Sequence, residues 1–334
     1  MLRQTSRSFY LTLRVLPRAV RPQIALAYLL ARTADTVADT ELVPHEQRLE
    51  ALRQLRQRIR NTARPALNFT HLAAHQGTHA ERQLLEQAEA SLGALETLDP
   101  ADARRVRDVL DIILSGQELD LQRFAEASAR NVLALQTETE LDDYTWRVAG
   151  CVGEFWTRLC RAHLFPNAPL DETRLLADAV RFGKGLQLVN ILRDLAADLR
   201  KGRCYLPQTE LRRLELAPAD LLNPDNEARL RPLYDRYLDL AIAHLTAGWA
   251  YTNALPWRCA RVRLACAWPI LIGLRTLALL RTARVLEPTR PVKVSRAEVR
   301  RLLALSVLTY PLPPLWRRLA PGAPAAPPRP TSER

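Results

Sequence analysis

The chain has 334 residues, of which 48% are hydrophobic and 25% are charged, and this composition is typical of a globular protein with a packed core. Its formal net charge is +12, but nearly all of the basic residues are arginines scattered along the chain, and no nucleic-acid recognition motif accompanies them. Nucleic acid is therefore not a predicted partner.

The first half of the chain is predicted to be helical. Its long stretches are rich in Ala, Leu, Arg and Glu, which favour helices. The stretch that begins near Gln23 is apolar almost all round, so its helix is predicted to be buried until Pro44 ends it. Asp99 and Pro100 break the pattern before a later helix. The other predictions in this half are helices at 45–60, 80–95 and 101–127, with a polar segment at about 61–78.

The second half is also predicted to be helical, because no stretch alternates polar and apolar residues as a strand does. The fold class is therefore all-α, with about ten helices in one domain, a helical bundle, over residues 1–310. Residues 311–334 contain eight prolines and are predicted to be a disordered tail. The helices predicted in this half cover 140–163, 171–199, 226–286 as two or three helices, and 295–305.

The five cysteines are irregularly spaced, which predicts reduced, mostly buried thiols in a cytoplasmic protein. The first residues carry no apolar core of the signal-peptide kind. The most apolar run, 264–274, is interrupted by Arg275 short of the ~20 residues that span a bilayer, so we predict a buried core helix there. Peripheral contact with the inner face of the membrane is left open, and a monomer is favoured.

Two acidic pairs are the candidate chemical groups. Asp35 and Asp39 are spaced four apart in an apolar helix, so both carboxylates lie on one face. Like charges on a buried face repel, and a hard divalent cation offsets them. Taken alone, such a pair is equally well an ordinary surface pair. Asp194 and Asp198 repeat the same spacing on a second predicted helix.

The second acidic pair belongs to a longer polar stripe. Gln187 and Asn190 precede it at helical spacing, so all four oxygen-bearing side chains share one face among apolar neighbours. This stripe predicts a binding surface for Mg²⁺ and a diphosphate, because Mg²⁺ binds through a few carboxylates and substrate phosphate oxygens. Arg32, Arg193 and Arg203 lie close to the two pairs in sequence and offer guanidinium groups to phosphate, although for any single arginine a solvated surface position is the better prediction.

Several segments resemble the squalene/phytoene synthase family, in the family's order, over roughly residues 5–304. The segments are TSRSF at 5–9, YLLARTADTVAD at 28–39, YTWRVAGCVG at 144–153, QLVNILRDLAAD at 187–198 and GRCYLP at 202–207. The resemblance, most like a bacterial squalene synthase, implies an isoprenoid-synthase fold with a central cavity and the two acidic motifs facing each other at its mouth.

The resemblance also implies residue roles. Mg²⁺ and the diphosphate are expected at Asp35, Asp39, Asn190, Asp194 and Asp198. Tyr144 is expected near the reacting carbons. Further diphosphate contacts are expected from Ser8, Tyr28, Arg32, Gln187, Arg193, Arg203 and Tyr205, and Phe9, Gln187 and Val148 are expected to line the cavity. The segment 116–120 carries Asp120 and is left open as cavity-facing or surface.

The implied activity is prenyl transfer that joins two farnesyl diphosphates head to head through presqualene diphosphate. The PVKVSR segment at 291–296 resembles a family segment linked to NADPH, so Lys293 and Arg296 are candidates for binding that cofactor and squalene is the expected product. Phytoene synthase and presqualene diphosphate synthase, which lack the hydride step, remain alternatives. So does a helical assembly factor without turnover, although the two acidic motifs are intact.

Overall fold

The chain folds into helices nearly throughout, which confirms the predicted all-α class. The structure is a computed structural model that describes residues 12–40, 42–60, 65–287 and 292–320. The α-helices, in chain order, are α3 (Arg21–Ala38), α4 (His45–Arg60), α5 (Thr70–Ala74), α6 (His79–Glu86), α7 (Ala88–Glu96), α8 (Pro100–Arg123), α9 (Glu138–Thr145), α10 (Cys151–Leu164), α11 (Glu172–Arg200), α12 (Gln208–Arg212), α13 (Glu227–Ala254), α14 (Ala260–Leu280), α15 (Arg296–Thr309) and α16 (Pro313–Arg317).

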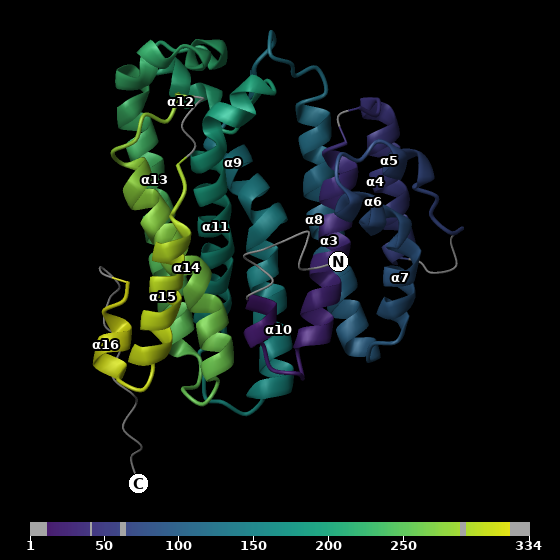
Figure 1. Cartoon of the computed structure of the whole chain (residues 1–334), viewed down its shortest axis with the longest axis vertical. Coiled ribbons are helices and arrows are strands. Elements are labelled where there is room, and N and C mark those ends of the chain that lie inside the picture. Colours follow the sequence, from purple (N-terminus) through teal and green to yellow (C-terminus); the bar gives the residue numbers. More distant parts are fainter. Residues whose placement is uncertain (1–11, 41, 61–64, 288–291, 321–334) are drawn as a thin grey trace.

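The short elements between the helices are few. A π-helical turn, η1 (Trp146–Gly150), joins α9 to α10, and two 3₁₀ turns, η2 (Pro218–Leu222) and η3 (Pro224–Asn226), precede α13. The chain crosses the molecule in order, from α3–α8 at one side, through α9–α11 in the middle, to α13–α16 at the other side (Figure 1).

Polar caps fix the helix starts that the sequence predicts. The side chain of Asp99 accepts a hydrogen bond from the backbone N–H of Ala101 at 2.9 Å, and Pro100 fits the first turn of α8 because its missing N–H is not needed there. Asp171 caps α11 in the same way. The predicted helix at 80–95 is instead divided into α6 and α7 at Gln87, and the polar segment before it contains the short α5.

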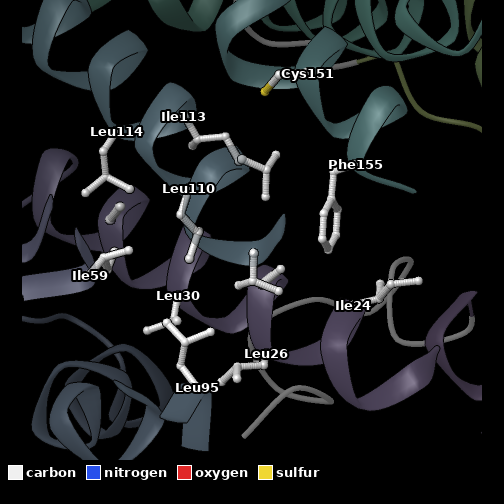
Figure 2. Close-up of a cluster of buried hydrophobic side chains, with 14 of the residues drawn as sticks. Ile24, Leu26, Leu30, Ile59, Leu95, Leu110, Ile113, Leu114, Cys151 and Phe155 are labelled. Atoms are coloured by element: carbon white, nitrogen blue, oxygen red, sulfur yellow. The ribbon is translucent and has the colours of Figure 1, made fainter. Parts of the chain in front are cut away.

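Two hydrophobic cores pack on either side of the middle helices. The first joins α3, α4, α7, α8 and α10, and Figure 2 shows Leu30, Ile59 and Leu110 meeting there from three of these helices. The second joins α9, α11, α13 and α14. Each fully buried leucine side chain contributes roughly 1.5–3 kcal/mol relative to an exposed one. The middle helices α10 and α11 are thus supported from both sides.

A short parallel pairing follows the end of α11. Strand β2 (Arg203–Cys204) pairs with β1 (Leu133–Ala134), and Leu133 donates its N–H to the carbonyl of Gly202 at 2.9 Å. Gly202 has φ +79°, and a Cβ there would lie 2.3 Å from the backbone nitrogen of Ser128. Only glycine therefore fits this turn, and the turn directs Arg203 and the residues after it back toward α8.

The predicted disordered tail is wrong for its first ten residues. Residues 313–317 form α16, and Trp316 is fully buried. Its indole stacks on Trp249 at a ring-centre distance of 5.2 Å and donates to Asn253 Oδ1 at 2.9 Å. A high proline content predicts disorder, but two of these prolines begin a helix, and the buried Trp316 holds that helix on α13. Residues 321–334 lie outside the described residues.

Trp316→Ala is expected to lower the free energy of unfolding by about 3–5 kcal/mol, as for other fully buried aromatic side chains. If only α16 detaches, the loss is smaller and protease cleavage after residue 312 becomes faster instead. Urea unfolding and limited proteolysis distinguish these results. The control is Leu319→Ala. Leu319 is partly buried, so its substitution should lower the free energy of unfolding by less. Wild-type behaviour of Trp316→Ala in both assays would contradict the packed position of α16.

Helix α14 contains the predicted core run. By length and composition alone it is long and apolar enough to cross a membrane, and no other helix in the described part of the chain passes that test. However, 56% of its most apolar window is buried inside the protein, and it packs against α11, α13 and α15. This placement agrees with a core helix. All five cysteines are free, and four of them are buried, as predicted.

Candidate active site

The first acidic motif lies near the end of α3, with Asp35 and Asp39 one turn apart. Gln117 of α8 donates a hydrogen bond to Asp35, and Arg32 lies 3.6 Å from the same carboxylate. Burial by surrounding atoms raises the pKa of Asp35 to about 6, while the charge of Arg32 opposes that rise and the charge of Asp39 adds to it. The side chain is still 45% exposed, so it lines a recess that solvent can enter.

The second acidic motif lies on α11 and is crowded in a similar way. Arg193 donates to Asp194 with an Nε–Oδ1 distance of 2.9 Å. Burial and, to a smaller extent, the neighbouring charge of Asp194 together raise the pKa of Asp198 to about 7. Asn190, one turn before Asp194, is exposed and donates to Gln187 at 3.4 Å. The predicted stripe is therefore formed, with its carboxylates close enough to repel.

Helix α8 supplies two side chains to the same site. Gln117 and Asp120 stand three residues apart and so share a face of the helix. Asp120 lies 4.0 Å from Arg203 and accepts a hydrogen bond from the hydroxyl of Tyr205 at 3.0 Å. Burial raises its pKa to about 6. The sequence left this segment open, and the structure assigns it to the site.

Two stacked tyrosines form the floor of the site. The rings of Tyr144 and Tyr205 are 4.8 Å apart at an angle of 21°, and both side chains are buried. Burial raises the pKa of Tyr144 well above its usual value, and the charge of Asp120 raises it further. Both hydroxyls therefore stay protonated at neutral pH.

The two motifs converge on this floor. The pKa of Tyr144 responds to the charges of both Asp198 and Asp35, which belong to opposite helices. The charge of Asp39 on α3 likewise raises the pKa of Asp120, and the charge of Asp120 raises the pKa of Asp198. The contacts of α8 agree with this: Gln117 contacts Asp35 of α3, and Asp120 contacts Arg203 and Tyr205 beyond the end of α11. Helix α8 therefore links the two motifs, and we call the region between them the acidic recess.

The recess is chemically suited to a divalent cation. It gathers carboxylate oxygens whose mutual repulsion a cation would relieve. Two of its buried acceptors, Gln117 Oε1 and Asp120 Oδ1, have no hydrogen-bond partner. Within the described residues, no group of three or more His, Cys, Asp or Glu side chains is placed to hold a metal ion. The donor set fits Mg²⁺ that keeps waters and takes further oxygens from a phosphate group.

An apolar cavity of about 660 Å³ is lined mainly by residues of the second half of the chain. Val148 lines it one turn after Tyr144, and Leu186 lines it one turn before Asn190. The walls come from η1, α10, α11, α14 and α15, and its few polar lining residues include Arg296 and Arg300. A charged recess next to an apolar chamber is suited to a molecule with an anionic head and a hydrocarbon tail.

Glycines set the width of this cavity. A Cβ on Gly153 of α10 would lie 2.0 Å from the carbonyl oxygen of Ala179, and one on Gly183 of α11 would lie 2.2 Å from that of Ala149. The two helices therefore cross in direct backbone contact while both line the chamber. The π-helical turn η1 lies at this crossing, and such turns are frequent at functional sites.

The remaining predicted site residues fall into three groups. Tyr28 is partly buried on α3, one turn before Arg32. Lys293 and Arg296 are both exposed, and Arg296, at the start of α15, also lines the apolar cavity. Ser8 and Phe9 lie outside the described residues. Gln117 and Asp120 belong to the segment 116–120 that the sequence leaves open, and nothing local separates them from the many other charged and polar side chains of α8.

Comparison with known proteins agrees with this architecture. The chain is similar in fold to TcSQS in a ligand complex, with a TM-score of 0.74 at 23% identity over 94% of this chain and 86% of that one. It is also similar to squalene synthase HpnC from Alicyclobacillus acidocaldarius, with a TM-score of 0.59 at 19% identity over 84% and 89% of the two chains. At these identities the likeness shows the fold.

Sequence relatives include two activities. The chain is 30% identical to a bifunctional lycopene cyclase/phytoene synthase of Colletotrichum graminicola over 73% of this chain and 39% of that protein. It is 25% identical to the squalene synthase of Saccharomyces cerevisiae over 84% and 60% of the two chains. The chain thus spans about two fifths of the first relative and three fifths of the second.

The sequence profile described as "Squalene/phytoene synthase" matches residues 2–298. Both acidic motifs, Tyr144 and the walls of the cavity up to the start of α15 lie within this match. The chain belongs to the squalene/phytoene synthase family.

Proposed function

We propose that the chain is a squalene synthase that condenses two farnesyl diphosphates head to head through presqualene diphosphate and reduces the product with NADPH. Members of the family are prenyltransferases that act on prenyl diphosphates. The observation that carries the proposal is that Tyr144, whose pKa is raised by aspartates of both acidic motifs, precedes by four residues Val148, which lines an apolar cavity. That arrangement matches a substrate with a diphosphate head and a hydrocarbon tail.

The acidic recess would hold the diphosphate together with Mg²⁺. The proposed ligands are Asp35, Asp39, Asn190, Asp194 and Asp198. Bound Mg²⁺ would neutralise the leaving diphosphate, so that its allylic C–O bond can ionise. Because no group of three or more described His, Cys, Asp or Glu side chains is placed to hold a metal ion, these side chains would share the coordination with diphosphate oxygens and water.

Basic and aromatic side chains around the recess complete the proposed site. Arg32, Arg193 and Arg203 would donate to diphosphate oxygens, as guanidinium groups do bidentately. Gln187, Tyr28 and Tyr205 are proposed as further diphosphate contacts, Tyr205 from its stacked position beside Tyr144. Tyr144 would face the reacting carbons with its hydroxyl protonated, since burial and the nearby carboxylates raise its pKa.

The cavity would take the hydrocarbon chains. Its volume of about 660 Å³ lies in the usual range for ligand pockets, and its apolar walls, Val148 among them, would keep water from an allylic cation. Arg296 lines the cavity beside exposed Lys293, and these two residues would bind the phosphates of NADPH. NADPH when bound would supply a hydride to the rearranged cation.

Product analysis tests the proposal. Purified protein is incubated with farnesyl diphosphate and Mg²⁺, with and without NADPH, and the lipid extract is separated by mass. Squalene only in the presence of NADPH is the expected result. Accumulation of presqualene diphosphate under both conditions would contradict the reductive step, and no product from any prenyl diphosphate would contradict the whole proposal.

Phytoene synthase is the second candidate, because the chain is 30% identical to the 15-cis-phytoene synthase of a Synechocystis strain over 71% of this chain and 63% of that protein. It would use geranylgeranyl diphosphate and need no hydride. The same assay with that substrate separates the two candidates. A C40 product formed without NADPH, in preference to any C30 product, would favour phytoene synthesis.

Mg²⁺ is expected to stabilise the protein more at pH 8 than at pH 5.5. Burial raises the pKa of Asp35 to about 6 and of Asp198 to about 7, so the folded state binds protons more tightly than the unfolded state. Without metal, their contribution to stability is therefore lost as the pH rises from about 4 to about 7. A cation offsets that loss only where the carboxylates are ionised.

Thermal unfolding with and without Mg²⁺ at the two pH values checks this expectation. The matched control is the Asp35→Asn, Asp198→Asn double variant, which should show a small Mg²⁺ shift at both pH values. An equal Mg²⁺ shift at pH 5.5 and pH 8 in the wild-type protein would contradict the assignment.

A further inference from the structure

Helices α15 and α16 lie at one edge of the molecule (Figure 1), and they expose a row of large apolar side chains. Among the described residues, ten large hydrophobic side chains are exposed, and five of them lie within residues 305–315. Leu308 is 72% exposed and Leu312 is 52% exposed. We call this row the apolar ridge, and its members are Leu305, Val307, Leu308, Leu312 and Leu315.

The ridge is held facing outward by contacts on the opposite side of both helices. Trp268 of α14 donates to the buried hydroxyl of Ser306 at 3.0 Å. Trp316 is fully buried against Trp249, and Tyr310 stacks on Trp257 at 4.3 Å. Because these anchors fix the rotation of α15 and α16, the leucines cannot turn into the core. Their exposure is a fixed property of the fold.

The surroundings of the ridge are positively charged. Arg301, Arg317 and Arg318 are exposed beside it. The only acid in residues 296–318 is Glu298, and it is paired with Arg275 of α14. An apolar row flanked by unopposed arginines is the pattern of a surface that inserts shallowly among lipid acyl chains and attracts anionic headgroups.

We propose that the apolar ridge docks the protein on the surface of an anionic lipid bilayer. A second copy of this chain is a poorer occupant, because a symmetric contact would bring the arginines of both copies together without acids to oppose them. An anionic bilayer offers acyl chains to the leucines and negative headgroups to the arginines. The opposite face of α15 lines the apolar cavity through Val299 and Leu303, so docking would place the bilayer next to a cavity wall.

Vesicle flotation of the full chain tests the proposal independently of turnover. The vesicles are pure phosphatidylcholine, or phosphatidylcholine with about 30% phosphatidylglycerol to give a negative surface. The ridge variant carries Leu308→Ser, Leu312→Ser and Leu315→Ser. The matched control carries the same change at three leucines that are exposed elsewhere, and these are Leu42, Leu222 and Leu240. Circular dichroism establishes that each variant is folded.

The wild-type chain and the control should float with anionic vesicles and bind neutral ones weakly, and binding should fall as salt is added. The ridge variant should bind anionic vesicles at least about tenfold more weakly, because three leucines no longer insert. Arg301→Glu with Arg318→Glu should weaken binding to anionic vesicles only. Equal flotation of the ridge variant and the control would overturn the proposal. So would a wild-type protein that ignores vesicles but forms a dimer that the ridge variant cannot form.

Discussion

Replacing Asp194 with asparagine is expected to lower kcat by at least about a hundredfold, the usual loss when a group that stabilises developing charge is removed. Asp194 stands one turn from Asp198 and raises its pKa by repulsion. Removing its charge relieves that repulsion, so the free energy of unfolding without Mg²⁺ should be unchanged or slightly higher. Loss of turnover without loss of stability is the distinguishing result.

Steady-state assays with farnesyl diphosphate and urea unfolding measure the two quantities on the same preparations. The control is Asp239→Asn, because Asp239 pairs with Arg281 at the surface and exposed pairs contribute little. Asp35→Asn, on the opposite helix, should lose turnover to a similar extent. Wild-type turnover in either motif variant would show that the substituted carboxylate is not needed for catalysis.

Gly183→Ala is expected to cost about 1–3 kcal/mol of unfolding free energy, as overpacking in a dense core does, and to reduce turnover strongly. The new methyl group would lie 2.2 Å from the carbonyl oxygen of Ala149 and 2.9 Å from the Cα of Gly150. Both are backbone atoms of η1, so η1 and α11 must move apart. Because both helices line the cavity, its shape changes with them.

Gly93→Ala in α7 is the matched control. No atom lies within 4 Å of a Cβ built there, so alanine should stabilise the helix by about 0.5–1 kcal/mol and leave turnover unchanged. Thermal unfolding and the product assay read out both variants. If Gly183→Ala were as stable and as active as Gly93→Ala, the close crossing of α10 and α11 would not limit the cavity.

The two acidic motifs show how far sequence reasoning reaches within the site. A spacing of four on a predicted helix is enough to place Asp35 beside Asp39, and Asp194 beside Asp198, because helix geometry is local. It is not enough to show that the two helices face each other. The resemblance supplied that expectation, and the shared effect of both motifs on Tyr144 supports it.

Asp120 illustrates what local patterns miss. On α8 it is one acid among several, and its sequence neighbours do not distinguish a cavity-facing acid from a surface one. Its importance comes from Tyr205 and Arg203, which approach it only because Gly202 turns the chain after α11 and β2 pairs with β1. A partner more than eighty residues away cannot be read from spacing.

The sequence by itself determined the helical class, the starts of the capped helices, the buried character of α3 and α14, and the pairing of aspartates within each motif. These properties depend on side chains within a few turns of one another. The tertiary structure alone decided which helices enclose the cavity, that α8 completes the acidic recess, and that α16 is anchored by Trp316 and turns the apolar ridge outward. Those outcomes depend on long-range packing. The burial of Trp316 holds a helix in a segment whose proline content predicts disorder. Gly183 is needed because the carbonyl oxygen of Ala149 would lie 2.2 Å from a Cβ at that position.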